Sequence, residues 1–349
     1  MGKFVRNIFI IGAPVIIVAL LCLYYKFSVR PQLTGGLGEL GKFEFGQEYD
    51  ARMDSTDYPD YRVVTLTGRD DSVLRRDGTP QILTMGDSFS QQGRNGYQNI
   101  MAHHTDTAVF NLKWAEMGIG LEGLYSEQMA ISLLNTGFFD SIPNAVMILE
   151  GTERYFADRF LNLNFESGFF DSPPRMESRM SWQKEFADWF RLKTGLSDNP
   201  VLRARLSRDF FSHPRYASDL FFYYEDLERF DISPAELRRI EANLRRLHEM
   251  FAVRGIPLIY VVVPDKYDVY EDYIVDNPFG PKPLKDKITD LQERLPWLIF
   301  PLDSLKARLE AGEEDIYMVH DTHWSAKGAA VLSDLLLEKI GARGATSPD

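Results

Sequence analysis

Two short strings in the sequence carry side chains that could together catalyse acyl transfer. Residues 86–90 read Gly-Asp-Ser-Phe-Ser, and residues 321–325 read Asp-Thr-His-Trp-Ser. Ser88 could serve as a nucleophile, His323 as its general base, and Asp321 as the carboxylate that orients the imidazole. Each string alone is ambiguous, because Ser88 could equally cap a helix and an Asp-x-His pair also occurs at metal sites.

Short apolar runs without polar alternation are typical of strands buried on both faces of a parallel sheet. These runs are Gln81–Met85, Thr107–Leu112, Ala145–Leu149, Pro257–Val263 and Trp297–Leu302. Segments of helical length lie between and after them: Gln91–His104, Leu121–Asn135, Pro234–Arg254, Lys285–Arg294 and Ala326–Ile340. This alternation predicts an α/β fold, with a three-layer arrangement of a parallel sheet and helices on both of its faces.

Ser88 and His323 are both expected at the carboxyl edge of this sheet, where open α/β folds bind their ligands. Ser88 follows the Gln81–Met85 run, and Gly86 would allow a tight turn between them. His323 lies in a turn before the last helix, and we expect Ser325 to cap that helix. Catalysis by this pair requires hydrogen-bond contact between the serine hydroxyl and the imidazole.

The first 30 residues are predicted to form a membrane anchor. No residue from Asn7 to Tyr25 is charged, and a helix of this length spans about 28 Å, close to the hydrocarbon core of a bilayer. The bulky residues around Cys22 favour an uncleaved signal anchor over a cleaved signal peptide. Lys3, Arg6 and the free N-terminus favour a cytoplasmic N-terminus. We therefore expect a single-pass protein of the inner membrane with a periplasmic catalytic domain.

The net charge of the chain is −12, and because the first 30 residues contain four basic and no acidic residues, the rest carries −16. Such an acidic chain repels polyanions, so nucleic acid is not an expected partner.

We predict a tether and lead-in segment at residues 31–79 and one domain at residues 80–349. Residues 152–232 break the alternation and are rich in aromatics, which predicts a mostly helical insertion that could be a lid, a partner surface or a satellite core.

The two strings resemble the SGNH (GDSL) hydrolase superfamily, whose flavodoxin-like domain uses a serine, a histidine and an aspartate. The resemblance assigns these roles to Ser88, His323 and Asp321. Gly-Asp-Ser-Phe with Asp-x-His-Trp is similar to the alginate O-acetyltransferase branch, membrane-linked or periplasmic proteins that acetylate exopolysaccharide. In the alginate proteins the Asp-x-His pair precedes the serine. Here the serine comes first, as in ordinary SGNH enzymes and in the D-alanyl transfer protein of teichoic acid synthesis, so the polymer cannot be carried over.

The same resemblance suggests residues that could contact the oxyanion or the substrate. A Glu-Arg pair at the end of the third strand, two nearby glycines and a Pro-x-Lys-x-x-x-Tyr pattern after the fourth strand are similar to that branch. The candidates are Gly118, Gly120, Arg154, Lys266 and Tyr267. Each has a structural alternative: a plain turn for the glycines, a salt bridge with Glu150 or Glu153 for Arg154, and a structural role for the Lys-Tyr pair.

The resemblance implies an extracytoplasmic O-acyltransferase that carries an acetyl group on Ser88 and passes it to a hydroxyl of a cell-surface or exported polysaccharide. The acetyl donor would come from a partner of the membrane-bound O-acyltransferase type. Two alternatives stay open: a carbohydrate esterase (deacetylase) that uses the same residues, and a non-catalytic glycan-binding or scaffold protein. No cofactor and no metal are expected, because a third metal ligand is not evident beside Asp321 and His323.

Overall fold

The structure is a computed structural model, and most of the chain can be described. The described residues are 2–29, 49, 52–53, 55–66, 73–113, 125–140, 142–166, 186–187, 189–191, 194, 196, 201–227, 232–280 and 282–344.

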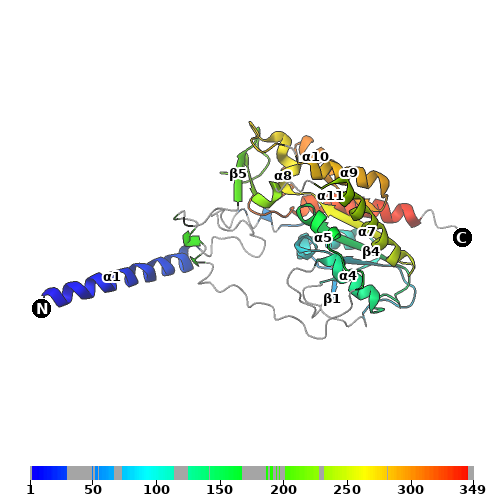
Figure 1. Ribbon diagram of the computed structural model, residues 1–349, viewed down its shortest axis with the longest axis horizontal. Helices are drawn as coiled ribbons and strands as arrows, with labels where there is room; N and C mark the ends of the chain where they lie inside the picture. The colour runs from blue at the N-terminus through cyan, green and yellow to red at the C-terminus, as the bar shows by residue number, and fades with distance from the viewer. Residues whose placement is uncertain are drawn as a thin grey trace.

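A six-stranded parallel sheet with the strand order β1-β3-β2-β4-β7-β8 forms the centre of the molecule (Figure 1). Its strands are β1 (Val64–Leu66), β2 (Gln81–Met85), β3 (Ala108–Leu112), β4 (Ala145–Thr152), β7 (Leu258–Val263) and β8 (Leu298–Ile299). Every residue of β2 and β7 is buried, as expected of strands covered on both faces. The α/β class is confirmed, and each of the five predicted runs contains a strand.

The helices pack against the sheet in two groups. α3 (Tyr97–His104) contacts α11 (Ala326–Gly344), whereas α4 (Ser126–Asn135) and α5 (Phe156–Leu161) contact α7 (Pro234–Ala252). This grouping fits the predicted three layers, with the sheet between the two sets of helices (Figure 1). The remaining helices of the domain are α8 (Lys266–Tyr270), α9 (Pro283–Arg294) and α10 (Leu302–Glu310).

Local sequence signals explain where some of these helices begin. α7 begins with a capping box, in which Ser233 Oγ accepts the Glu236 N–H and the Glu236 carboxylate accepts the Ser233 N–H. The helix predicted from Gln91 is instead divided: the 3₁₀ turns η3 (Ser88–Gln91) and η4 (Gly93–Asn95) precede α3. The turn that follows β2 therefore begins at Ser88 itself.

The folded domain extends upstream of residue 80, into the predicted lead-in segment. β1 pairs with β3 at the edge of the sheet, and Tyr49 is 1% exposed within the core. The phenol of Tyr49 donates to Asp315 Oδ1 and accepts the Val319 N–H. The predicted lead-in segment thus contributes a strand and a core side chain.

The described part of the predicted insertion contains elements of the domain and a small antiparallel ribbon. β4 runs on to Thr152 and α5 packs against α7. β5 (Val201–Arg205) pairs with β6 (Asp219–Tyr223) in a second sheet. The mostly helical prediction missed this ribbon, because short apolar runs such as Leu220–Phe222 fit a strand or a helix equally well.

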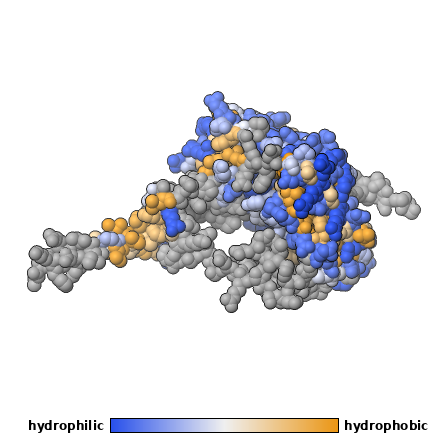
Figure 2. All heavy atoms as spheres, in the orientation of Figure 1, coloured by the Kyte–Doolittle hydropathy of each residue, from blue (hydrophilic) through white to orange (hydrophobic). Residues whose placement is uncertain are grey.

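Helix α1 (Gly2–Tyr24) extends away from the rest of the molecule (Figure 1). The segment Gly12–Val29 has a mean hydropathy of 1.8 and is 11% buried. Figure 2 shows hydrophobic residues gathered along the described part of this helix. Its length and composition are those that a membrane-spanning helix requires.

Candidate active site

The structure brings Ser88, His323 and Asp321 together at the carboxyl edge of the sheet. His323 Nε2 lies 2.7 Å from Ser88 Oγ, and His323 Nδ1 lies 2.6 Å from Asp321 Oδ1. Because Asp321 Oδ1 accepts a hydrogen bond from the Nδ1–H group, it favours the tautomer whose Nε2 can accept the Ser88 proton. Ser88 is exposed, whereas His323 and Asp321 are 3% and 0% exposed. The nucleophile is thus the member of the group that a substrate can reach.

Asp87 fixes the turn that presents Ser88. Its Oδ1 accepts the Phe89 N–H at 3.1 Å, so Asp87 caps η3. Its Oδ2 accepts the Thr152 N–H at the end of β4, also at 3.1 Å. The cap that was the structural alternative for Ser88 is therefore provided by its neighbour, and the Ser88 hydroxyl is left in contact with His323.

Gly86 is required by packing, not by a special backbone conformation. A Cβ at this position would lie 2.1 Å from Glu150 Oε2 and 2.3 Å from Ser90 Oγ. Glu150 is buried beneath the turn and accepts the Ser90 hydroxyl at 2.7 Å. Burial and the negative charge of Asp87 raise the pKa of Glu150 well above its usual value. The tight-turn explanation for Gly86 is replaced by close approach to this carboxyl.

Arg159 in α5 anchors Asp87 from the interior. Its Nη2 lies 2.7 Å from Asp87 Oδ2 and its Nη1 lies 3.0 Å from Glu127 Oε2, while the side chain is 2% exposed. Burial raises the pKa of Asp87, but the positive charge of Arg159 and the hydrogen bonds from Glu150 and the Phe89 N–H together outweigh burial, so the pKa is lowered. The importance of Arg159 was not visible in the sequence, because it lies ten residues beyond the predicted strand Ala145–Leu149 and 72 residues from Asp87.

The loop that carries His323 is held by aromatic packing and by its own hydrogen bonds. The Phe89 ring lies 4.5 Å from the His323 ring and 4.9 Å from the Trp324 ring, measured between centroids. The Met318 N–H donates to the His323 carbonyl at 3.1 Å. Ser325 Oγ accepts the Lys327 N–H, so Ser325 caps α11 as predicted.

Lys266 and Tyr267 lie in the interior of the domain, with exposed fractions of 1% and 0%. The Lys266 ammonium donates to the backbone carbonyls of Met318, Val319 and Asp321. This burial does not fit the substrate contact that the sequence suggested for the two residues. Lys266 instead supports the loop on which Asp321 stands.

Arg154 forms an ion pair with Asp226 and a looser one with Asp265, at 3.9 Å. These partners are aspartates, whereas the structural alternative for Arg154 was a salt bridge with Glu150 or Glu153. Burial raises the pKa of Asp226 to about 7, although the charge of Arg154 opposes this shift. A guanidinium engaged in this way is a poor candidate for an oxyanion donor. Gly118 and Gly120 lie outside the described residues, so their proposed N–H groups stay a prediction.

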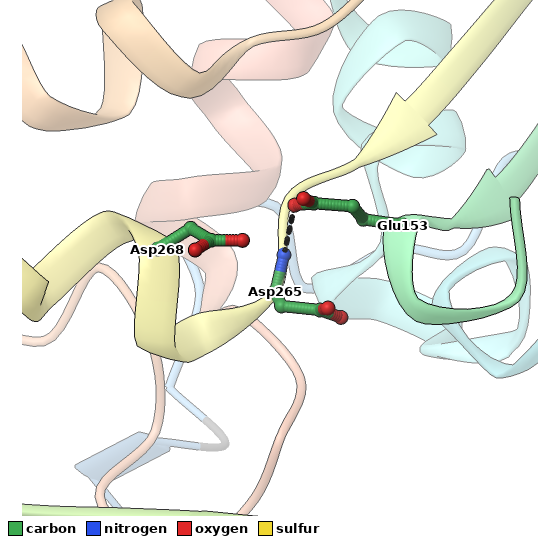
Figure 3. Close-up of side chains that lie close together, drawn as sticks. All are labelled: Glu153, Asp265 and Asp268. Carbon is green, nitrogen blue, oxygen red and sulfur yellow. Dashed lines mark hydrogen bonds between the residues drawn. The ribbon is translucent and has the colours of Figure 1, made fainter. Parts of the chain in front are cut away.

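Three buried carboxylates, those of Glu153, Asp265 and Asp268, lie close together after β4 and β7 (Figure 3). The Asp265 N–H donates to Glu153 Oε2 at 3.1 Å. Lys282 Nζ lies 2.7 Å from Asp265, 3.0 Å from Asp268 and 3.6 Å from Glu153. Burial opposes the charge of Lys282, but the three carboxylates raise its pKa well above its usual value. The ammonium thus supplies the positive charge that a metal ion would bring to such a set.

We expect Gly86→Ala to lower the free energy of unfolding by about 1–3 kcal/mol, because the added methyl group must displace the Glu150 carboxyl. Denaturant unfolding monitored by circular dichroism measures this loss. Gly341→Ala in α11 is the control, since a Cβ there meets nothing within 4 Å, and we expect it to be neutral or stabilising by up to about 1 kcal/mol. Equal effects of the two substitutions would contradict the packing explanation.

We expect Arg159→Met to cost about 3–5 kcal/mol of stability, because it leaves the carboxylates of Asp87 and Glu127 without their cation. The same unfolding measurement applies. Arg308→Met is the matched control: its side chain is 51% exposed and its contacts with Glu313 and Asp334 are 3.7 and 3.8 Å long. The decrease in the free energy of unfolding caused by Arg308→Met should stay within about 1 kcal/mol. A loss of this small size at Arg159 would show that the buried network does not support the turn.

The family model described as "SGNH hydrolase-like domain, acetyltransferase AlgX" matches residues 218–347, a range that includes Asp321 and His323 but not Ser88. No curated protein gives a significant match. Among solved structures, the protein YXIM of Bacillus subtilis is similar at 12% identity with a TM-score of 0.33, over 77% of this chain and 58% of that chain. This chain therefore spans less than two thirds of that structure, and the likeness is too low to carry an argument. Over residues 218–347 the chain is therefore similar to the SGNH hydrolase-like domain of the acetyltransferase AlgX, and its parallel α/β sheet fits that match.

Proposed function

We propose that this protein is an extracytoplasmic O-acyltransferase that moves acetyl groups through Ser88 onto hydroxyls of a cell-surface or exported polysaccharide. The observation that carries the proposal is the 2.7 Å contact between His323 Nε2 and Ser88 Oγ, completed by Asp321 at Nδ1. The match to a domain of an acetyltransferase supports acetyl as the transferred group.

In the first half of the reaction, Ser88 Oγ attacks the carbonyl carbon of the acetyl donor while His323 Nε2 accepts the serine proton. The tetrahedral intermediate then collapses, the bond between the carbonyl carbon and the donor oxygen breaks, and His323 returns the proton to the departing oxygen. Asp321 holds the ring and stabilises the imidazolium. The backbone N–H of Gly118 or Gly120 remains our proposed donor to the oxyanion.

In the second half, a sugar hydroxyl takes the place of the departed donor. His323 accepts the hydroxyl proton, the sugar oxygen attacks acetyl-Ser88, and Ser88 Oγ leaves with the proton from His323. Water in place of the sugar yields acetate and makes the same residues an esterase. The proposed transferase and its esterase alternative therefore differ only in the nucleophile that reaches acetyl-Ser88.

The proposed setting is the inner membrane, with the N-terminus of α1 in the cytoplasm and the catalytic domain in the periplasm. The supporting observation is a helix long and apolar enough to span a bilayer. Acetyl-CoA is a cytoplasmic donor, so the acetyl group would be passed across the membrane by a partner of the membrane-bound O-acyltransferase type. The anchor would keep the domain beside that partner.

The test uses full-length protein in nanodiscs, with p-nitrophenyl acetate as donor and a panel of oligosaccharides of different composition as acceptors. We expect acetylated sugar and free p-nitrophenolate from the wild type. Ser88→Ala and His323→Ala should fall to the uncatalysed background, and Asp321→Asn should lose on the order of 10³–10⁴-fold in kcat. Ser55→Ala removes a hydroxyl from an exposed serine that donates to the Arg52 carbonyl, and it should keep full activity.

Release of p-nitrophenolate without any acetylated sugar would favour the esterase over the transferase. If Ser88→Ala kept the full function of the protein, both the transferase and the esterase would be contradicted. The non-catalytic alternative, a glycan-binding or scaffold protein, would then remain.

A further inference from the structure

We propose that Lys266 is a positioning residue, which holds Asp321 and His323 in register with Ser88 by binding the backbone of the loop that carries them. The inference rests on the proposed function of Ser88, His323 and Asp321 and adds to it a residue that does not touch the reacting atoms.

The three protons of the Lys266 ammonium match three carbonyl oxygens of this loop. Nζ lies 2.6 Å from the Met318 oxygen, 3.1 Å from the Val319 oxygen and 3.1 Å from the Asp321 oxygen. An ammonium has three donors and no acceptor, so these contacts use its full capacity. Within the described residues, no strand pairs with residues 318–321. The buried ammonium therefore supplies hydrogen bonds to carbonyls that a neighbouring strand would bond in a sheet.

The position of Lys266 is itself set by the sheet. Lys266 follows β7 closely, β7 pairs with β4, and β4 pairs with β2, the strand that leads to Ser88. The Tyr317 hydroxyl donates to the Pro264 carbonyl at 2.6 Å, which adds a second bond between the loop and the end of β7. A rigid path of three adjacent strands therefore connects the nucleophile to the cation that holds the base and its carboxylate.

The charge of Lys266 depends on pH within the ordinary working range. Burial lowers the pKa of Lys266 to about 7, against the effects of the negative charges of Asp321 and Asp226. The Phe211 ring also faces the ammonium, with its centroid 5.3 Å from Nζ. Below this pKa the ammonium serves all three carbonyls. Above it, the neutral amine has only two donors, and its lone pair faces a carbonyl oxygen.

The contact between Lys266 and the loop carbonyls predicts that the pH profile of activity falls on its alkaline side. A histidine base must be uncharged to accept a proton, so activity rises with pH on the acid side. Activity then falls as the pH rises through about 7, where Lys266 loses its proton and the loop loses a hydrogen bond. Loss of this hydrogen bond affects the geometry of Ser88, His323 and Asp321 and not donor binding, so it changes kcat more than KM.

The test compares Lys266→Met and Lys266→Arg with the wild type, using p-nitrophenyl acetate hydrolysis from acid to alkaline pH. Lys266→Met should lower kcat by about 100-fold with little change in KM, since a shift of about 1 Å at a catalytic group has this effect. It should also lose the alkaline limb. Lys266→Arg stays charged, so it should recover part of kcat and show no fall near pH 7.

Lys287→Met is the matched control, because Lys287 also donates to a backbone carbonyl, that of Ile232, but on α9. It should keep the wild-type kcat and pH profile. Unfolding curves establish that each variant is folded. If Lys266→Met does not fold, the test rests on Lys266→Arg. If the activity of Lys266→Arg fell at alkaline pH as in the wild type, the proposal would be overturned. Unchanged kcat in folded Lys266→Met would overturn it as well.

A readout without turnover separates this inference from the proposed function. In protein with ¹⁵N-labelled histidine, the Nδ1 proton shared by His323 and Asp321 should give a downfield resonance that Asp321→Asn abolishes. Folded Lys266→Met should weaken or lose this resonance. If the wild type shows the resonance and its dependence on Lys266 but hydrolyses no ester, the proposed function fails and the positioning role stands. A resonance that is unaffected in Lys266→Met overturns the positioning role.

Discussion

The hydrogen bond between His323 Nε2 and Ser88 Oγ joins two loops that lie 235 residues apart in the chain. Neither loop is a regular element along its whole length, so each must be fastened to the sheet for the bond to persist. On the side of Ser88, the fastening is the ion pair of Asp87 with Arg159. On the side of His323, it is the contact of Lys266 with three carbonyls. β4 and β7 are adjacent strands; Arg159 lies on α5, which follows β4, and Lys266 begins α8, which follows β7.

The partners of a buried lysine decide whether it keeps its charge, as a comparison of Lys266 with Lys282 shows. Lys282 and Lys266 are 2% and 1% exposed, yet their pKa values shift in opposite directions. Lys282 touches two carboxylates and lies near a third, which together outweigh the desolvation penalty. Lys266 touches only neutral carbonyls, so desolvation prevails and its charge becomes labile near neutral pH. Neutral partners allow a lysine to support a loop and to respond to pH.

The sequence predicted the residues whose roles follow from the order of elements, and not those whose roles depend on tertiary contacts. Ser88 follows a buried strand and His323 precedes the last helix, so a parallel sheet already brings both to one edge. The function of Arg159 depends on a carboxylate 72 residues away, and that of Lys266 on carbonyls more than 50 residues away, and no periodicity signals either. For Gly86 the sequence allowed a turn, but only the position of Glu150 shows that a side chain would not fit. β1 has three residues, which is too short for a strand pattern to be recognised.

Transfer to a sugar, as opposed to hydrolysis, requires a sugar hydroxyl to reach acetyl-Ser88 before water does. His323 Nε2 can accept a proton from either nucleophile, and Ser88 is exposed to both. The preference must therefore arise outside the triad, from binding of the acceptor and from the rate at which the donor reacylates the serine. In the proposed function, a membrane anchor contributes to the second factor, because holding the domain beside the proposed membrane-bound donor would raise the effective concentration of that donor. In the proposed function, the triad and its two cationic supports set a rate common to transfer and hydrolysis, and α1 together with the acceptor surface sets the ratio between them.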